Sequence, residues 1–584
     1  MTADEAMRLD ILSDLRASDK LCPYRIEVAV EDATIVLTGE VETWDEVVAA
    51  GYLAARRRGV RNVVNELTAK RVPRPGAAAA SPWPAEGPPL PGWTDHADVV
   101  IIGGGVIGTA IARELSRYQL EIVLLERSAD VAAGASKANN GMVHPGVDPE
   151  PGSLKATLNV RGNALFGAVC ADLDVPFVRS GLCGVTLTDQ DAALLPLLRA
   201  RAEANGVPGV EVLDRQETLR RVPGLTLRVT GAFWAPTTAM TSPYQLTVAY
   251  AENAVANGVR LFLETAAVGL DIVGGRVAAV RTNRGPIAAR WVINAAGVYA
   301  DEVSAMTGHK EFTIHPRRGV LMVFDRQATD PGPSIGHFGL GMPEHSKGGG
   351  AMVTVDGNLE LGPDAEELPG RDDVAVTAEG LRFVIAKWSG ILPGFPLDSV
   401  IAYFAGLRAA TYTEDFHVAL SRKVGRLIHV AGIQSPGLAS APAVAEMVTG
   451  LLRSDGLSLI ERHDWQPVRR APPRVAGLAP EALAELVAKD PAHGRLVCRC
   501  ERVSEAEIKR AIGGPVPAGT IDAIKRRTRA GMGRCQGAFC GPRVAAILSG
   551  ELRRPITELT KDGPGSWLFA GRTKAQGDLN STTQ

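Results

Sequence analysis

The stretch that decides the fold is Asp98-Val99-Val100-Ile101-Ile102-Gly103-Gly104-Gly105-Val106-Ile107-Gly108. A strand-length apolar run leads directly into a glycine-rich turn, and helical spacing follows over residues 109–119. In such a motif the first glycine permits a tight turn, the second lets backbone approach a pyrophosphate, and the third lets helix and strand pack closely. The start of the helix supplies amide donors to phosphate. The pattern predicts a dinucleotide site.

The next predicted strand ends in Glu126, 18 residues after Gly108. A carboxylate at this point can accept hydrogen bonds from ribose hydroxyls, whereas an NADP site would place a cation there, and Arg127 is adjacent. The chain contains one such fingerprint, which argues against a reductase built from two dinucleotide folds. Two more strand-to-turn segments, residues 288–297 and 429–438, favour FAD over NAD. The second leads into a helix, and a helix start can aim its amides at a flavin.

Length and composition limit the class of protein. With 584 residues and about 150 residues per domain, we expect about three or four domains. The 63 basic and 65 acidic residues nearly balance, which argues against a nucleic-acid-coating protein and against a disordered acidic chain. The first ten residues lack the basic and apolar regions of a secretory signal, and no apolar run reaches the ~20 residues of a membrane span. We therefore expect a cytoplasmic protein without a transmembrane segment.

Two proline-rich stretches divide the chain into an N-terminal module, a long α/β body and a cysteine-rich module. The predicted boundaries are 1–71 for the N-terminal module, 72–94 for a Pro/Ala-rich linker, 95–462 for the body, 463–493 for a second linker with an acidic helix at 480–489, 494–552 for the cysteine module and 553–584 for a polar tail, frayed from residue 571.

The N-terminal module predicts a small α+β fold. Its pattern gives a helix, two alternating strands, a second helix and a last strand, at residues 6–17, 26–30, 34–41, 46–57 and 62–67. With Gly39 after the second strand, this order resembles the BON domain. The resemblance implies docking to a phospholipid surface or a partner protein, so that the enzyme would lie peripherally on the inner face of the membrane. The alternative is a small module without a partner.

Residues 137–146, 151–160 and 404–408 of the body resemble the FAD-dependent oxidoreductases of the D-amino-acid-oxidase superfold, in particular glycerol-3-phosphate and L-2-hydroxyglutarate dehydrogenases. The resemblance covers nearly all of residues 96–460. It implies an α/β architecture, a Rossmann-like FAD-binding domain with an inserted mixed-sheet α+β substrate domain. The implied cofactor-binding residues are Gly103, Gly105, Val106, Ile107, Gly108, Glu126, Arg127, Lys137, Asn139, Asn140, Val268, Ala296, Gly297, Gly432, Gly437 and Leu438.

Oxidation of a secondary alcohol by hydride transfer to a flavin needs a base for the hydroxyl proton and cations for an anionic substrate. By the resemblance, His144 is this base or a hydroxyl-orienting group, and Arg318 and Arg408 line the substrate side. The alternatives are a core or flavin-contacting histidine and ordinary strand-end charges. The substrate that the resemblance implies first is sn-glycerol 3-phosphate. Because a guanidinium suits phosphate and carboxylate equally, an L-2-hydroxy acid or an amino acid remains an alternative.

Four cysteines form a second motif, in which Cys498-x-Cys500 is separated by 34 residues from Cys535-x4-Cys540. The spacing lacks the paired C-x2-C of a zinc ribbon and resembles the small helical bacterioferritin-associated ferredoxin-like [2Fe-2S] domain, with structural zinc as the alternative. Residues 495–543 hold eleven Lys/Arg against four Asp/Glu, a net +7 that would offset the charge of a four-thiolate cluster. A docking surface for an acidic partner is the alternative interpretation of this charge.

A flavin takes two electrons as hydride, whereas an iron–sulfur centre passes electrons singly. The combination therefore favours a dehydrogenase over an oxidase, with electron exit to a quinone or a partner subunit. The remaining alternative is a redox scaffold or sensor that acts through the N-terminal module.

Overall fold

The computed structural model describes residues 2–72, 86–326, 332–339 and 348–571. Most of the predicted first linker, 73–85, and most of the predicted frayed tail, 572–584, lie outside the described residues. The chain divides into two compact units. The first contains Met1–Arg127 and Ala132–Arg469, and the second contains Ser128–Val131 and Arg470–Gln584.

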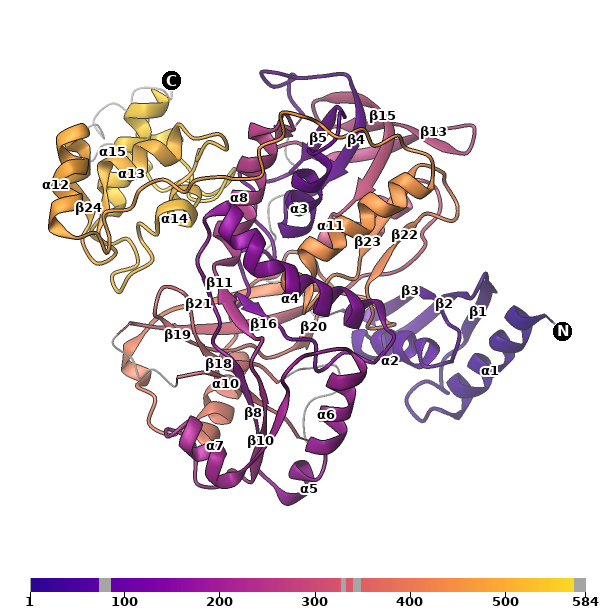
Figure 1. Cartoon of the computed structure of the whole chain (residues 1–584). Coiled ribbons are helices and arrows are strands. Elements are labelled where there is room, and N and C mark those ends of the chain that lie inside the picture. The colour runs from indigo at the N-terminus through magenta and orange to yellow at the C-terminus, as the bar shows by residue number, and fades with distance from the viewer. Residues whose placement is uncertain (1, 73–85, 327–331, 340–347, 572–584) are drawn as a thin grey trace, which may run out of the picture. The chain divides into compact units, whose positions relative to one another are not determined.

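The first unit begins with a three-stranded sheet in the order β1-β2-β3, against which two helices pack (Figure 1). Strands β1 and β2 are antiparallel, whereas β2 and β3 are parallel. The second helix starts at a capping box between Thr43 and Glu46. The bounds are Ala3–Ala17 for α1, Ile26–Glu31 for β1, Thr34–Thr43 for β2, Trp44–Ala55 for α2 and Asn62–Arg71 for β3. The predicted order of helices and strands is confirmed.

A larger sheet carries the glycine motif. Its strands β12, β5, β4, β15 and β23 are parallel, and antiparallel strands extend it. Val99 and Ile101 face a core shared with four helices, α3, α4, α8 and α11, whereas Val100 and Ile102 face the opposite core. Burial on both faces explains the continuous apolar run in the sequence. The bounds are His96–Ile102 (β4), Val106–Leu115 (α3), Ile122–Leu125 (β5), Leu154–Leu173 (α4), Pro243–Ala256 (α8), Arg260–Phe262 (β12), Ala267–Val273 (β13), Arg276–Thr282 (β14), Gly285–Asn294 (β15), Ala300–Ala305 (α9), His417–Leu420 (β22), Leu427–Ala431 (β23) and Gly437–Ser454 (α11).

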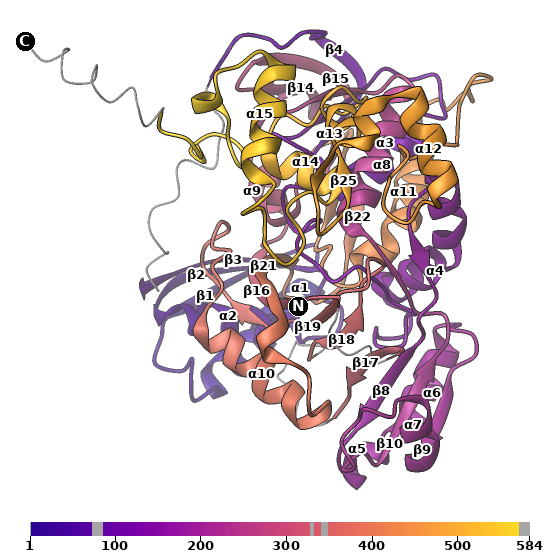
Figure 2. The ribbon, with the colours of Figure 1, turned by 90° about the vertical axis from the view of Figure 1, so that its left-hand side faces the viewer.

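The inserted part of the first unit is built on a mixed nine-stranded sheet in the order β20-β16-β19-β18-β17-β8-β10-β9, with β21 also paired to β16. Helix α10 covers one face of this sheet (Figure 2). Its Trp388 is buried in the core that helix and sheet share. The bounds are Leu182–Thr186 (β8), Asp189–Ala192 (α5), Leu195–Ala204 (α6), Glu211–Asp214 (β9), Arg215–Arg221 (α7), Gly231–Ala235 (β10), His315–Phe324 (β16), Ser334–His337 (β17), Gly350–Val353 (β18), Leu359–Gly362 (β19), Glu366–Glu367 (β20), Ala378–Ile391 (α10) and Val400–Ala410 (β21). A small sheet of Met142–Val143 (β6), Ala239–Thr241 (β11) and Phe177–Val178 (β7) lies apart from both large sheets. The predicted α/β class with a mixed-sheet insertion is confirmed.

The second unit is mainly helical, as predicted for the cysteine module. Its bounds are Pro480–Lys489 (α12), Leu496–Cys498 (β24), Val503–Ser504 (β25), Glu505–Ile512 (α13), Ile521–Thr528 (α14) and Gly541–Leu552 (α15). Asp130 is buried in this unit and accepts hydrogen bonds from Arg526 at 2.9 and 3.0 Å and from Arg527 at 2.8 and 2.9 Å. Although burial opposes ionisation, the two guanidinium groups hold the pKa of Asp130 below its ordinary value.

Among the described residues, none of the helices combines the length and the apolar character needed to span a bilayer.

Candidate active site

The glycine turn adopts the geometry that the sequence predicted. Gly103 has a φ of +117°, and a Cβ added there would lie 2.4 Å from the carbonyl oxygen of Ala295. A Cβ on Gly108 would lie 1.9 Å from the carbonyl oxygen of Gly103. At the start of α3, the Val106 N–H donates to Ser136 Oγ at 2.8 Å. Strand, turn and helix therefore approach one another so closely that only glycine fits at residues 103 and 108.

Glu126 meets this turn from the end of β5. It is buried, and its Oε2 accepts a hydrogen bond from the Gly104 N–H at 2.8 Å. The next side chain, Arg127, lies 3.9 Å over the ring of Tyr299 and 3.7 Å from Asp372. The carboxylate predicted for ribose hydroxyls and the turn predicted for pyrophosphate are thus brought together.

The other predicted cofactor residues lie in turns and at one bulge. Asn139 and Asn140 accept hydrogen bonds from the N–H groups of Gly141 and Met142 at 3.0 and 3.2 Å, which fixes the turn that follows Lys137. Val268 lies at a shift in the register between β13 and β14 and is 49% exposed. Ala296 and Gly297 follow β15 at the edge where Ala295 meets Gly103.

His144 contacts the turn before α11. Its Nε2 lies 3.3 Å from Ser435 Oγ. The His144 carbonyl oxygen accepts hydrogen bonds from two asparagine side chains of α4, Asn159 at 2.8 Å and Asn163 at 2.9 Å. The turn itself contains Gly432, with a φ of +67°, and leads into Gly437 and Leu438 at the helix start. Two predicted segments far apart in sequence therefore meet at this histidine.

Arg408 lies on β21 opposite Arg317 of β16. Its guanidinium crosses Gly319, where a Cβ would lie 2.6 Å from Nη2. It donates to the carbonyl oxygens of Arg318 at 3.3 Å and Asp364 at 3.0 Å, and no carboxylate of the described residues lies within ion-pair distance. Burial, together with the nearby charge of Arg317, lowers the pKa of Arg408 to about 10.

The face of the sheet that carries Arg408 also contacts the turn of predicted cofactor residues. Gly406, two residues before Arg408, packs against Ala138, whose carbonyl oxygen would lie 2.3 Å from an added Cβ. Since side chains two apart on a strand share a face, Arg408 points toward the side of the sheet on which residues 137–140 lie. A cation without a carboxylate is thereby placed beside the candidate flavin site.

Arg318 points to the other face of β16 and pairs with Glu366 at 2.6 Å and Asp373 at 2.9 Å. The structure therefore does not bring it together with Arg408, and its role in substrate binding stays a prediction. Its neighbour Arg317 shares the face of Arg408 and donates to the Gln434 side chain at 3.3 Å. Arg317 was not predicted from the sequence, although strand alternation from Arg408 indicates it once the pairing is known.

The four cysteines of the second unit come together. The sulfurs of Cys498 and Cys500 lie 3.7 Å apart, which suits two thiolates on one tetrahedral metal, because metal–sulfur bonds of about 2.3 Å separate such ligands by about 3.8 Å. A hydrogen bond from Cys540 lowers the pKa of Cys498 to about 5. The backbone N–H of Phe539 lowers the pKa of Cys535, which also contacts Cys500. Burial raises the pKa of Cys500 to about 11, and the contact with Cys498 raises the pKa of Cys540. The fit to an iron–sulfur cluster therefore rests on the four cysteines as a ligand set and not on their ionisation.

Three segments of the chain match known families. Residues 3–71 match the BON domain, and residues 496–549 match the BFD-like [2Fe-2S] binding domain. Residues 98–451, more than half of the chain, match the FAD dependent oxidoreductase family. The chain belongs to the FAD-dependent oxidoreductases. The predictions of FAD, of a [2Fe-2S] cluster and of a BON domain are confirmed by these matches.

This oxidoreductase is 40% identical over 483 residues to a glycerol 3-phosphate dehydrogenase of Caloramator mitchellensis, with 82% of this chain and 99% of the relative covered. It is 24% identical over 491 residues to one subunit of the anaerobic glycerol-3-phosphate dehydrogenase of Escherichia coli K12, covering 78% and 88% of the two chains. The FAD-bound, dithionite-reduced L-alpha-glycerophosphate oxidase of Mycoplasma pneumoniae superposes with a TM-score of 0.61 at 25% identity, over 65% of this chain and 100% of that one.

FAD fits the residues present in this oxidoreductase. Glycine at residues 103 and 108 allows the close strand–helix approach of a dinucleotide-binding turn, and Glu126 lies where it can exchange its hydrogen bond from Gly104 for the ribose of the cofactor. The bulge at Val268 frees backbone groups from the strand ladder. We infer that these residues hold the adenosine and pyrophosphate, and that the turn before α11 holds the flavin end.

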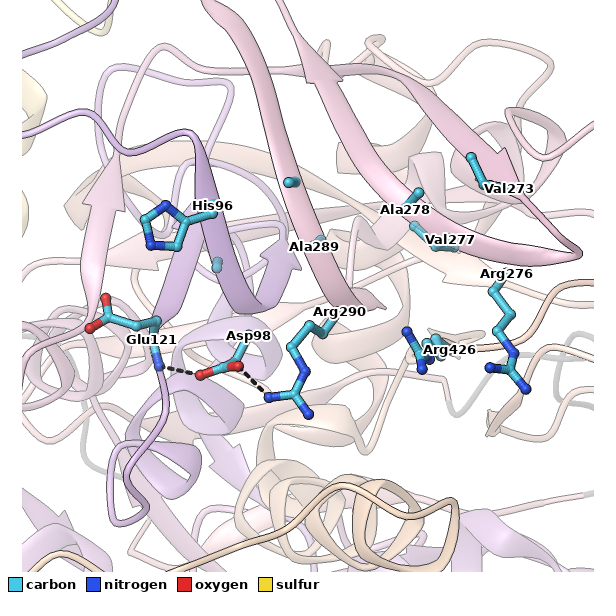
Figure 3. Close-up of a pocket in the computed structure, with 12 residues that line it drawn as sticks. His96, Asp98, Glu121, Val273, Arg276, Val277, Ala278, Ala289, Arg290 and Arg426 are labelled. Carbon is cyan, nitrogen blue, oxygen red and sulfur yellow. Dashed lines mark hydrogen bonds and ion pairs between the residues drawn. The ribbon is translucent and has the colours of Figure 1, made fainter.

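A separate hollow of about 480 Å³ lies at the opposite edge of the same sheet (Figure 3). His96 and Glu121 stand at the start of β4 and just before β5, whereas the glycine turn follows the carboxyl end of β4. Asp98 pairs with Arg290 in this hollow at 2.7 Å. In open α/β sheets ligands bind beyond the carboxyl ends of the strands, so this hollow is not the flavin site.

Proposed function

We propose that the enzyme oxidises sn-glycerol 3-phosphate to dihydroxyacetone phosphate and passes the electrons through the [2Fe-2S] domain. The observation that carries this proposal is Arg408, a partly buried cation that has only carbonyl partners among the described residues and faces the turn of cofactor residues. Such a cation is costly unless an anion completes its shell. The name of the 40% identical relative supports phosphate as that anion.

The residues of this chain divide the work of the oxidation. Arg408 binds the anionic group with its guanidinium fork and thereby orients the carbon that carries the hydroxyl group. His144 accepts the hydroxyl proton at a ring nitrogen, and Ser435, 3.3 Å from its Nε2, orients the ring. FAD, when bound, supplies the acceptor for the hydride equivalent. The substrate thus loses one hydride and one proton.

We also propose that the enzyme is a dehydrogenase whose electron acceptor is a quinone or a partner subunit. The [2Fe-2S] domain supports an outlet for single electrons, and the relative that forms one subunit of an anaerobic enzyme supports a redox partner. An aerobic assay tests this part. A wild-type enzyme that produces one hydrogen peroxide per substrate as fast as it reduces a quinone analogue would contradict it.

An anaerobic substrate screen tests the substrate. The FAD-loaded full chain is mixed with sn-glycerol 3-phosphate, an L-2-hydroxy acid or an amino acid, and flavin bleaching is followed by absorbance. We expect rapid bleaching by sn-glycerol 3-phosphate alone. Bleaching only by the 2-hydroxy acid would show that Arg408 serves a carboxylate, since the fork suits both anions. The enantiomer sn-glycerol 1-phosphate is the matched control for non-specific anion effects.

A further inference from the structure

The BON domain packs tightly against the catalytic domain within the first unit. The Thr313 N–H donates to the carbonyl oxygen of Val63 at 3.0 Å, and the Asn65 N–H donates to Thr313 Oγ1 at 3.0 Å. The side chain of Asn65 donates to the Tyr412 hydroxyl at 3.1 Å. Tyr412 belongs to the same apolar cluster as the buried residues of the BON domain, such as Ile35. The contact is therefore a continuous core and not a loose tether.

Tyr52 of helix α2 contacts β20 of the catalytic domain, where its hydroxyl lies 3.4 Å from Glu367 Oε1. Its ring meets His315 and Tyr412 edge to face, with centroids 5.3 and 5.5 Å apart. Its hydroxyl donates to Glu414 Oε1 at 2.7 Å and accepts a hydrogen bond from Arg317. Because Tyr52 is 8% exposed, these polar contacts are shielded from water.

The partners of Tyr52 lead to the turn that carries the candidate flavin residues. Arg317 donates to the Gln434 side chain at 3.3 Å, and the Gln434 amide in turn donates to Glu414 Oε2 at 2.5 Å. Gln434 precedes Ser435, which contacts His144 at 3.3 Å. Against the cost of burial, the charge of Arg317 lowers the pKa of Glu414 to about 2. A charged, hydrogen-bonded network thus connects the BON domain with the turn before α11.

We propose that Tyr52 is a positioning residue of the catalytic site and that the BON domain is therefore a structural part of this oxidoreductase. The Tyr52 hydroxyl fixes Glu414 and Arg317, and these two hold Gln434 and the turn at which flavin and His144 meet. The proposal rests on the proposed function only for its rate measurement. The resemblance to BON domains led us to expect docking without a catalytic contribution, and the buried hydroxyl adds this second role.

The Tyr52→Phe variant removes one oxygen and keeps the ring that packs on His315 and Tyr412. Tyr24→Phe is the matched control, because the Tyr24 hydroxyl bonds Glu46 inside the BON domain at 3.2 Å. A hydrogen bond to a charged group is worth about tenfold in rate if it is needed at the transition state. We expect Tyr52→Phe to reduce the limiting rate of anaerobic flavin reduction by about this factor and to raise KM, because the released Glu414 carboxylate can turn toward Arg408 and compete with the substrate.

The second measurement does not depend on turnover. FAD is titrated into the full-length apoprotein and its dissociation constant is read from the change in flavin fluorescence. We expect Tyr52→Phe to bind FAD several-fold more weakly than the wild type and Tyr24→Phe to match it. If none of the candidate substrates reduces the wild type, the proposed function fails, and the FAD affinities of the two variants still decide the role of Tyr52. Equal FAD affinity in Tyr52→Phe and Tyr24→Phe would overturn the proposal.

Gly51→Ala provides an independent variant at the same contact. A Cβ on Gly51 would lie 2.3 Å from the Tyr412 ring, which is buried and hydrogen-bonded. The substitution favours the helix and opposes the contact, so we expect it to loosen the packing of the BON domain on Tyr412 without unfolding α2. Gly450→Ala in α11, with no atom within 4 Å of the added Cβ, is its control. We expect Gly51→Ala, like Tyr52→Phe, to bind FAD several-fold more weakly than the wild type. Wild-type FAD affinity in Gly51→Ala would also refute the proposal.

Discussion

Replacing Arg408 with Gln tests whether this cation is kept for a ligand. The terminal guanidinium nitrogens lie 3.3 and 3.0 Å from the carbonyl oxygens of Arg318 and Asp364, and glutamine puts a shorter, uncharged N–H donor in their place. The substitution removes the positive charge, whose hydrogen-bond partners among the described residues are these two carbonyl oxygens. If Arg408 is retained for stability, this change should destabilise the protein. If Arg408 is retained to bind an anion, the stability of the protein should not fall.

The lowered pKa of Arg408 gives the size of the expected effect. A change from 12.5 to about 10 corresponds to at most about 3 kcal/mol of unfavourable interaction of the charged form. The side chain is half-buried, so solvent screening reduces this to about 1–2 kcal/mol. Removing the charge should therefore leave the thermal midpoint of the FAD-free protein unchanged or raise it. Loss of a charge-assisted contact to the substrate should reduce kcat/KM by about 10²-fold or more.

Two assays on the same preparations measure these quantities. Thermal unfolding of the apoprotein is followed by intrinsic fluorescence, and anaerobic flavin reduction is followed over a range of substrate concentrations. Arg382→Gln is the matched control, since Arg382 is 73% exposed and its ion-pair partner among the described residues is Glu379, one helical turn away. A clear drop in the thermal midpoint of Arg408→Gln together with wild-type kcat/KM would show that Arg408 is structural.

Three further substitutions have expected outcomes. Gly108→Ala should abolish stable FAD binding, measured by flavin fluorescence, because the added Cβ would lie 1.9 Å from the Gly103 carbonyl oxygen; retained stoichiometric FAD would count against the site. Asp130→Asn should lower the thermal midpoint of the second unit, followed by cluster absorbance, since removing one partner of a buried ion pair costs about 3–5 kcal/mol. Because the pKa of Asp130 is lowered in the folded state, this contribution is present above about pH 4 and is lost below it, so variant and wild type should converge in acid. Cys535→Ser should remove the electron paramagnetic resonance signal of the reduced cluster, and an unchanged signal would exclude Cys535 as a ligand.

The parts of the site that could be predicted from sequence are those held by local spacing. The glycine turn and Glu126 follow consecutive strands, and the cysteine motif carries its own pattern, so each could be identified without a fold. The contact of Tyr52 with Arg317 joins residues separated by 265 positions. Tyr52 stands in an ordinary helical pattern, and no local signal distinguishes it from a core tyrosine. The choice between Arg317 and Arg318 depended on which face of β16 meets the cofactor, which only the strand pairing determines.

Arg317 and Arg408 lie on the same face of the sheet but differ in their partners among the described residues, which are carboxylates for Arg317 and carbonyl oxygens for Arg408. Tyr52 contributes to this difference. Arg317 is neutralised by Glu367 at 2.6 Å and by Glu414, and its position is fixed by Tyr52 and Gln434. Both carboxylates are used by Arg317, so Arg408 remains the cation whose charge an incoming anion can satisfy. If Tyr52 released Glu414 and Arg317, the carboxylate could turn toward Arg408 and compete with the substrate. If Arg408 binds the substrate as proposed, holding Arg317 and Glu414 together is a condition for keeping Arg408 available. The proposal thus supplies a catalytic reason for the tight packing of the BON domain against the oxidoreductase.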